Sequence, residues 1–360
     1  MRNIENYLAL GVATLCSGSF QSVACTGISL TAKDGSYVQA RTIEWSHGAL
    51  KSEYVIIPRG EQLTSFTPKG VEGAKFTAKY GVVGLSVVQK QFIAEGINEK
   101  GLSAGLFFFP VYGSYKPFER ESSPSSLADL QVVQWILTQC ATIDEVKRGI
   151  ATMRIVGLEA GSVVHWRIGE PSGRQVVLEI VDGVPHFYEN KVGVITNAPG
   201  FEWHLTNLNN YVNLFPGDAS SQSIGGVRLQ PLGGNSGFLG IPGDATPPSR
   251  FVRAAFYRNT APQRGNGFDT VTQCFHLLNN FDIPIGIEHH AGKCPDVPSA
   301  TQWTSAIDLT NRRVYYKTAY NNTLRCIKLD EIDFAKVRYQ SHPLDSSPEQ
   351  PVEYIHIPQY

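Results

Sequence analysis

Short stretches in which apolar and polar residues alternate begin near position 26. Residues 26–45 read TGISLTAKDGSYVQARTIEW, and apolar positions alternate with polar ones on both sides of Asp34-Gly35. Asp-Gly pairs favour the positive φ angles of tight hairpin turns, so this segment predicts a β-hairpin. Apolar runs separated by turn residues predict further strands at 52–58, 80–88, 102–109, 162–168, 174–181 and 192–197. Another Asp-Gly pair, at 182–183, lies between the last two of these and predicts that they form a second hairpin.

Apolar residues spaced three and four positions apart predict helices in two regions. The first region follows Pro124, where one helical face would carry apolar residues from Leu127 to Cys140. The next segment, TIDEVKRGI, has acids in its first turn and bases after them, an order that the helix dipole favours. The predicted N-caps and starts are, in chain order, Ser125 or Ser126, Thr142, Pro247-Pro248 and Asp269.

The order of these elements predicts the fold class. Strands are followed by two helices, more strands, two more helices, and a final hairpin at 305–320 with a strand at 324–329. Segregated runs of strands and helices are typical of α+β folds with antiparallel sheets rather than of alternating βαβ units. We therefore expect helix layers covering sheets in a single domain. The Gly- and Pro-rich segment 231–248 is the longest predicted loop, and we expect it near an active site.

Composition and charge exclude several function classes. The chain has 360 residues, of which 31 are basic and 32 acidic, so its formal charge is −1. A nucleic-acid surface would need clustered positive charge, and a membrane span about eighteen apolar residues in a row; we expect neither. The six cysteines form no C-x-x-C pair and the nine histidines no H-E-x-x-H pattern, so we expect no cofactor or metal. For His289-His290 near Cys294, an exposed loop pair is favoured over a metal site.

The first 24 residues differ from the rest. A charged start, an apolar middle and the small residues Ser22-Val23-Ala24 are typical of a secretory signal. We expect residues 1–24 to be removed, leaving residues 25–360 as a periplasmic or secreted bacterial protein. A cytosolic N-terminal segment or a different pro-segment is the alternative. A lipoprotein would also expose Cys25, but the usual Leu three positions earlier is absent. In an exported chain Cys294 and Cys326 could pair.

Cleavage after Ala24 would make Cys25 the first residue, and that position has its own chemistry. The thiolate is the nucleophile, and a free cysteine has a pKa of about 8.5. The α-amine, with a pKa of about 8, can take the thiol proton and later return it. Nucleophile and base then share one residue, which is the N-terminal-nucleophile arrangement. Arg41 and Glu44 lie on the second hairpin arm, where Arg41 can face the first residues and favour the thiolate.

Four separated motifs now resemble a known family. CTGISL with ARTIEW, EGINEKGLSAGLFFFP, VITNAPGFEWHLTNLNNY and GIPGDATPPSRFVRAAF are similar, in this order, to the choloylglycine hydrolase family, from Cys25 to about residue 335. That family includes bile salt hydrolases and penicillin V acylases. The resemblance implies a four-layer αββα sandwich of the N-terminal-nucleophile hydrolase type and hydrolysis of a carbon–nitrogen amide bond.

The resemblance also implies roles for individual residues. They are Cys25 as nucleophile and general base, Arg41 beside the thiol, Glu44 as the site carboxylate, Asn197 as a side-chain oxyanion donor, Arg250 as a second arginine, and the backbone N–H of Phe108 as the other oxyanion donor. Glu44 stands where the family usually has Asp. Counting back from Pro110 gives Phe108, and a one-residue slip in this segment leaves Phe107 as the alternative.

The leading functional hypothesis is hydrolysis of conjugated bile salts, a small-molecule amide substrate made of a steroid acid and glycine or taurine. Phe107, Phe108 and Phe109, with Phe238 and Leu239 of the long loop, could line an apolar acyl pocket, although alternation along a strand assigns at least one of the three to the core. Penicillin V and N-acyl-homoserine lactones are alternative substrates. Two hypotheses of a different kind compete with these: a non-enzymatic binding protein of the same fold, and a papain-like thiol protease. The resemblance implies a homo-oligomer, commonly a tetramer.

Overall fold

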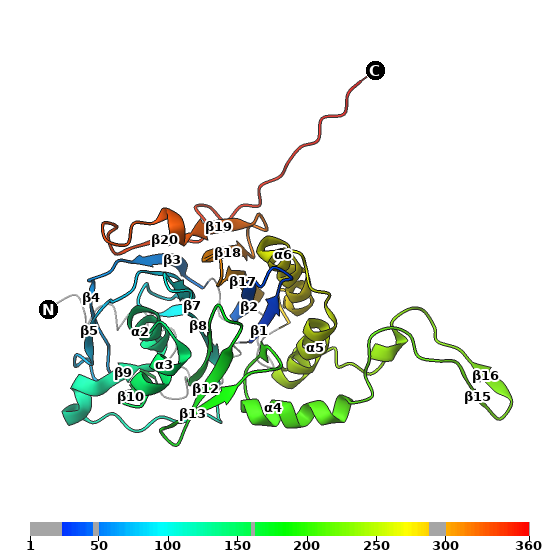
Figure 1. The fold of residues 1–360 in the computed structure, drawn as a ribbon, viewed down its shortest axis with the longest axis horizontal. Coiled ribbons are helices and arrows are strands. Elements are labelled where there is room, and N and C mark those ends of the chain that lie inside the picture. Colours follow the sequence, from blue (N-terminus) through cyan, green and yellow to red (C-terminus); the bar gives the residue numbers. More distant parts are fainter. Residues whose placement is uncertain (1–23, 46–49, 160–162, 288–299, 360) are drawn as a thin grey trace.

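The computed structural model describes residues 24–45, 50–159, 163–287 and 300–359. Two large antiparallel sheets face each other, with helices on both outer sides (Figure 1). The predicted α+β class and αββα layering are confirmed. One contiguous cluster of buried apolar side chains runs through the layers. Among the described residues, no helix has the length and hydrophobicity needed to cross a membrane.

The first sheet carries the N-terminal hairpin at its centre. Its six strands are, in spatial order, β14 (Val194–Ile195), β1 (Cys25–Thr31), β2 (Tyr37–Trp45), β17 (Ala300–Asp308), β18 (Arg313–Thr318) and β19 (Arg325–Lys328). The hairpin predicted at 26–45 is confirmed as β1 and β2, and Gly35 in its turn has a φ of +87°. The C-terminal hairpin and its following strand are confirmed as β17, β18 and β19.

The second sheet has eight strands. In spatial order they are β13 (Val184–Glu189), β12 (Gln175–Val181), β11 (Val164–Gly169), β8 (Ser103–Phe108), β7 (Ile93–Asn98), β6 (Val82–Val87), β3 (Ser52–Ile57) and β20 (Gln340–Pro343). The predicted strands at 52–58, 80–88, 102–109, 162–168 and 174–181 all belong to this sheet. Small two-stranded pieces complete the strands: β4 (Gln62–Thr64) with β5 (Lys75–Thr77), β9 (Ser126–Ala128) with β10 (Arg154–Val156), and β15 (Gln222–Ile224) with β16 (Val227–Leu229).

The helices form the two outer layers. Those beside the first sheet are α5 (Pro247–Thr260) and α6 (Gly267–Leu278), with α4 (Phe201–Asn207) against α5. The second sheet is covered by α2 (Val132–Gln139), which packs on β7 and β8, and α3 (Ile143–Ile150) contacts α2. Short 3₁₀ turns lie at Arg120–Ser125, Asp129–Gln131, Leu208–Tyr211, Ser236–Phe238, Asn279–Phe281 and Leu329–Glu331. In α3, a Cβ at Gly149 would lie 2.3 Å from the Trp135 ring, so glycine permits the close contact between α2 and α3.

Two helix starts were predicted correctly. Thr142 caps α3 by accepting a hydrogen bond from the Glu145 N–H at 3.2 Å, and α5 begins at Pro247. Two others were wrong. The segment after Ser125 first forms β9, which pairs in parallel with β10, so α2 begins only at Val132. The cap of α6 is Asn266, whose side chain accepts the N–H of Asp269.

One predicted strand pairing was also wrong. The Asp182-Gly183 turn joins β12 to β13, a strand that the sequence did not single out, whereas the strand predicted at 192–197 leaves that sheet and becomes β14 beside β1. Exposed and half-buried positions alternate along the first four residues of β13, which forms an edge of the second sheet. This change of sheet matters for function, because it brings the residues after Ile195 to the start of β1.

Candidate active site

Cys25 is the first residue of β1 and is almost completely buried. Its register partner in the hairpin is Ile43, and Arg41 is paired with Gly27. Because side chains alternate between faces with a period of two, Cys25 and Arg41 lie on the same face of the sheet, the face toward the second sheet.

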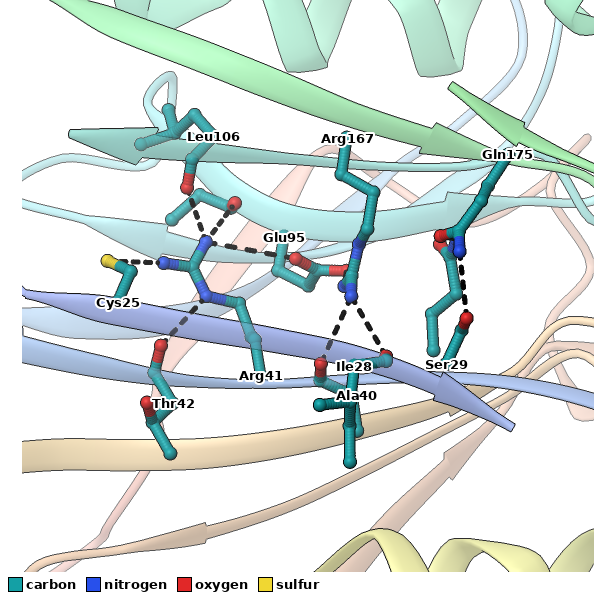
Figure 2. A network of polar contacts seen from close by, with 12 residues as sticks. Cys25, Ile28, Ser29, Ala40, Arg41, Thr42, Glu95, Leu106, Arg167 and Gln175 are labelled. Carbon is teal, nitrogen blue, oxygen red and sulfur yellow. Dashed lines mark hydrogen bonds and ion pairs between the residues drawn. The ribbon is translucent and has the colours of Figure 1, made fainter. Parts of the chain in front are cut away.

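Arg41 contacts the thiol directly. Its Nη2 donates to Cys25 Sγ at 2.8 Å, and the side chain is fully buried. Its Nη1 donates to the carbonyl of Ala94 at 3.0 Å and to that of Leu106, both on the second sheet, and its Nε donates to Thr42 O at 3.2 Å (Figure 2). These fixed acceptors hold the guanidinium in place beside the sulfur. The structure therefore places Arg41 next to the thiol, while its catalytic role stays a prediction.

Asn197 and Arg250 meet at the backbone of the same cysteine. The Cys25 N–H donates to Asn197 Oδ1 at 2.9 Å, and that oxygen also accepts from Arg250 Nη2 at 2.7 Å. Arg250 Nη1 donates to the Cys25 carbonyl and, at 2.9 Å, to Thr26 Oγ1. Asn197 follows β14 and Arg250 lies in the first turn of α5, so two elements far apart in sequence converge on the start of β1.

The second sheet brings Phe108 to the site. Asn197 Nδ2 donates to the Phe108 carbonyl at 2.9 Å, and the Phe108 backbone hydrogen-bonds the Cys25 thiol and lowers its pKa. Phe107, the alternative, is buried with its ring 4.1 Å from Arg41 Cζ, so it packs in the core. The backbone of Phe108 and the side-chain amide of Asn197 thus lie together next to the sulfur, as two oxyanion donors would need to.

Glu44 is also buried near the thiol, but while Ala24 is attached the Cys25 nitrogen donates its hydrogen bond to Asn197 and not to Glu44. That nitrogen is a peptide N–H after Ala24 and donates to Asn197. Glu44 Oε1 accepts from Thr301 Oγ1 at 3.1 Å, and the Glu44 N–H donates to the Ala24 carbonyl at 3.0 Å. The carboxylate therefore lies close enough to act on the thiol by charge, and its contact with a liberated amine stays a prediction.

The surroundings of the Cys25 thiol shift its pKa in opposite directions. Burial raises the pKa of the Cys25 thiol above its usual value, and the charge of Glu44 raises it further. The guanidinium of Arg41 is the strongest group acting the other way, followed by that of Arg250. In the chain that still carries Ala24, the net effect keeps the thiol protonated at neutral pH. An ammonium at this position would add a positive charge and favour the thiolate.

Two buried histidines behind the site were not found from the sequence. His204, on α4, meets the Asn197 carbonyl with Nε2 at 2.9 Å and stacks on Phe251 at 4.5 Å. Burial lowers its pKa to about 4, so it is neutral at pH 7. His165 meets Glu179 at 3.2 Å and the carbonyl of Thr196 at 3.1 Å. Both rings thus flank the Thr196–Asn197 backbone, and no local pattern in the sequence marks them.

The long loop at 231–248 lies beside the site, because α5 holds it there. Arg250 Nε donates to the Ala245 carbonyl at 2.8 Å, and Arg253 donates to the carbonyls of Pro242 and Asp244. Phe238 packs on Phe256 of α5, with ring centroids 5.9 Å apart, while Leu239 is exposed. The predicted proximity of the loop to the site is therefore confirmed by the contacts of Arg250.

The other cysteines that the structure describes are not bonded to one another. Cys140, Cys274 and Cys326 are free thiols. His289, His290 and Cys294 lie outside the described residues, so their interpretation stays a prediction. In the part of the chain that the structure describes, no group of three or more His, Cys, Asp or Glu side chains could hold a metal ion.

Known proteins are similar to this chain in both sequence and fold. A family model for linear amide C–N hydrolases of the choloylglycine hydrolase family matches residues 25–346. A bile salt hydrolase/transferase from Clostridium perfringens is 30% identical, over 85% of this chain and 93% of its own. A penicillin V acylase from Pectobacterium atrosepticum is 26% identical, over 96% of this chain and 92% of its own.

Solved structures agree. The crystal structure of a mutant conjugated bile acid hydrolase from Clostridium perfringens superposes with a TM-score of 0.80 at 28% identity and covers 92% of this chain and 100% of that one. The structure of penicillin V acylase from Agrobacterium tumefaciens gives a TM-score of 0.69 at 25% identity, covering 87% and 88%.

Proposed function

Because the chain belongs to the choloylglycine hydrolase family of linear amide C–N hydrolases, we propose that it hydrolyses the amide bond of conjugated bile salts with Cys25 as the nucleophile. The observation that carries the proposal is the 2.8 Å contact between Arg41 and a buried sulfur at the start of β1, with Asn197 and Phe108 beside it. The similarity to bile salt hydrolases over 85% of the chain supports the choice of substrate.

The proposed site forms when residues 1–24 are removed. The family match begins at Cys25, which supports cleavage after Ala24. Cleavage converts the nitrogen that now donates to Asn197 into an α-amine, bonded to the same Cα as the thiol-bearing Cβ. The leader is a secretory signal in this proposal, and the mature enzyme is periplasmic or secreted. Intact-mass measurement of the native protein tests this, and a working enzyme that retains its leader would contradict it.

The reaction then follows from the positions of the groups. The α-amine takes the thiol proton, and the thiolate attacks the amide carbon, forming an S–C bond and an oxyanion. The Phe108 N–H and Asn197 Nδ2 stabilise that oxyanion. The ammonium gives its proton to the leaving nitrogen as the C–N bond breaks, which releases glycine or taurine and leaves a thioester. Water then attacks the thioester and gives a proton to the α-amine, forming a second oxyanion. The S–C bond breaks, the bile acid leaves, and the ammonium returns that proton to the sulfur.

A substrate panel tests this function. Purified protein is incubated with glycocholate, taurocholate and penicillin V, and the amine released from each is quantified. We expect turnover of the bile salt conjugates, no turnover in Cys25→Ala, and wild-type turnover in Cys274→Ala, which removes a buried thiol from α6. Full activity in Cys25→Ala would contradict the mechanism. Hydrolysis of penicillin V alone would assign the second candidate, penicillin V acylase, which the match to the Pectobacterium protein supports.

The proposal includes assembly into a homo-oligomer, as the resemblance implies. A hairpin formed by β15 and β16 projects from the body of the molecule, and Ile224, Val227 and Leu229 on it are exposed (Figure 1). Exposed apolar side chains grouped on a projecting segment support an intermolecular contact. Light scattering of the purified protein tests it, with a tetramer expected and a monomer at micromolar concentration as the contrary result.

A further inference from the structure

Two buried arginines cross between the sheets in opposite directions. Arg41 starts on β2 of the first sheet and donates to carbonyls of the second. Arg167 starts on β11 of the second sheet and donates to the carbonyls of Ile28 and Ala40 on the first, both at 3.1 Å (Figure 2). Each side chain is at most 1% exposed. The two guanidiniums also share one aromatic ring, that of Phe107, at 4.1 and 5.6 Å.

A single carboxylate lies between these two cations. Glu95 on β7 accepts from Arg167 Nη2 at 2.8 Å through Oε1, and its Oε2 is 3.8 Å from Arg41 Nη1. Within the described residues, Oε2 accepts no hydrogen bond. Burying an oxygen without a hydrogen bond costs free energy, so its presence calls for an explanation. Here it faces Arg41, so its influence on that side chain is purely a matter of charge.

The backbone is shaped around this carboxylate. A Cβ at Gly105, on the neighbouring strand β8, would lie 2.0 Å from Glu95 Oε2. A Cβ at Gly27, on β1, would lie 2.8 Å from the Ile195 side chain, 2.9 Å from the Phe107 ring and 3.0 Å from Arg167 Nη1. The missing side chain at Gly105 therefore leaves the space that the carboxylate fills, and Gly27 permits the close packing of Arg167 and its apolar neighbours.

Figure 2 shows the order in space, with Arg41 between the sulfur and the carboxylate and Arg167 beyond it. We propose that Glu95 and Arg167 are positioning residues that set, through Arg41, how strongly the protein stabilises the Cys25 thiolate. Arg41 is the group that touches the sulfur, and the carboxylate on its other side offsets part of its charge. Arg167 in turn pairs with that carboxylate, which reduces the effect of its negative charge on Arg41. The proposal rests on the proposed role of Cys25 as nucleophile.

Opposite signs follow for the two partners. Glu95→Gln removes the negative charge beside Arg41. The full positive charge of Arg41 then stabilises the thiolate, which should form at lower pH. Arg167→Met leaves Glu95 to act on Arg41 alone, so the thiolate should form at higher pH. Shifts of about one pH unit are expected for a charge this close in a buried site. Loss of structural integrity alone would not move the two variants in opposite directions.

Other charged groups near the thiol are unchanged in these variants. Arg41, Glu44 and Arg250 act on the sulfur from β2 and α5, together with the cysteine's own α-amine. Two titratable groups, Tyr37 and Cys274, lie near Arg167; burial raises the pKa of both, that of Cys274 to about 12, so both are neutral at pH 7. The shifts therefore report on Glu95 and Arg167.

The test is the pH dependence of Cys25 alkylation in the mature protein. Iodoacetamide is added between pH 5 and 10, and mass spectrometry of the N-terminal peptide separates Cys25 from the exposed thiol of Cys326. The midpoint belongs to the coupled thiol–amine pair. We expect it to fall in Glu95→Gln and rise in Arg167→Met, with the acidic limb of kcat/KM moving the same way. Alkylation needs no substrate, so this result stands apart from the outcome of the substrate panel.

The control is Glu99→Gln, four residues along the chain, where the carboxylate pairs with Arg59 at 2.6 Å on the surface. Its midpoint should match the wild type. Glu95→Gln keeps the shape of the side chain and an acceptor for Arg167, so it decides the matter even if Arg167→Met does not fold. A midpoint in Glu95→Gln at or above the wild-type value, or a shift of the same sign in both variants, would overturn the proposal.

Discussion

The side chain of Asn197 allows a sharp test of the oxyanion site, because its two ends make different contacts. Oδ1 accepts from the Cys25 nitrogen at 2.9 Å and from Arg250 at 2.7 Å. Nδ2 is the donor end and lies 2.9 Å from the Phe108 carbonyl. Asn197→Asp preserves the shape and the acceptor end, and replaces only the nitrogen that would donate to the oxyanion.

The size of the effect follows from the missing donor. Removing one oxyanion donor costs about 2.7–4 kcal/mol of transition-state stabilisation, which is roughly a 100- to 1,000-fold loss in kcat. The new carboxylate also faces the Phe108 carbonyl and disfavours the Cys25 thiolate, so the loss should be at least this large. Because the donor acts on the transition state, KM should stay within about threefold.

The assay compares kcat and KM for whichever conjugate the wild type hydrolyses fastest. Asn190→Asp is a matched control, since Asn190 is also buried, donates to Val194 O at 2.9 Å and accepts from Gly193 N–H at 2.8 Å. Both variants leave a buried carbonyl without its donor, so both should lose about 1–3 kcal/mol of stability. Only Asn197→Asp should lose activity. A kcat within tenfold of the wild type, or an equal loss in the control, would refute the reasoning.

Three further predictions concern protonation and stability. The pKa of His204 is about 4 in the folded state and 6.5 in the unfolded state, so between these pH values only the unfolded chain binds the proton. The free energy of unfolding should therefore fall by about 3 kcal/mol as the pH drops from 6.5 to 4. Urea unfolding at several pH values should show this part of the dependence missing in His204→Phe. Burial raises the pKa of the Cys25 thiol while Ala24 is attached, so uncleaved protein should react with iodoacetamide more slowly at pH 7 than mature protein, and equal rates would speak against the role of the amine. Thr142→Ala removes the cap of α3 and should lower the free energy of urea unfolding by about 0.5–2 kcal/mol with kcat unchanged.

The first hairpin could be predicted from the sequence because everything that shapes it is local. The Asp34-Gly35 turn fixes the register of its two arms, and the period of two then puts Arg41 on the same face as Cys25. The family resemblance assigned Asn197, Arg250 and the backbone of Phe108 to the site. The local sequence around each of them does not indicate how far it lies from Cys25. The structure brings all three to one cysteine, together with His204, which the sequence did not mark.

Local pattern predicted most of the strands and helices and indicated Cys25 as the candidate nucleophile. It failed where a distant partner competes with local preference: residues Ser126–Ala128, which have a helical pattern, form a strand because Arg154–Val156 pairs with them. Only the tertiary structure decided that β14 pairs with β1 in the first sheet and not with β12 in the second. It alone also decided that Arg41 and Arg167 each donate to backbone carbonyls of the other sheet. Contacts between sheets depend on how the layers stack, and the sequence periodicity of a strand carries no information about the face of another sheet.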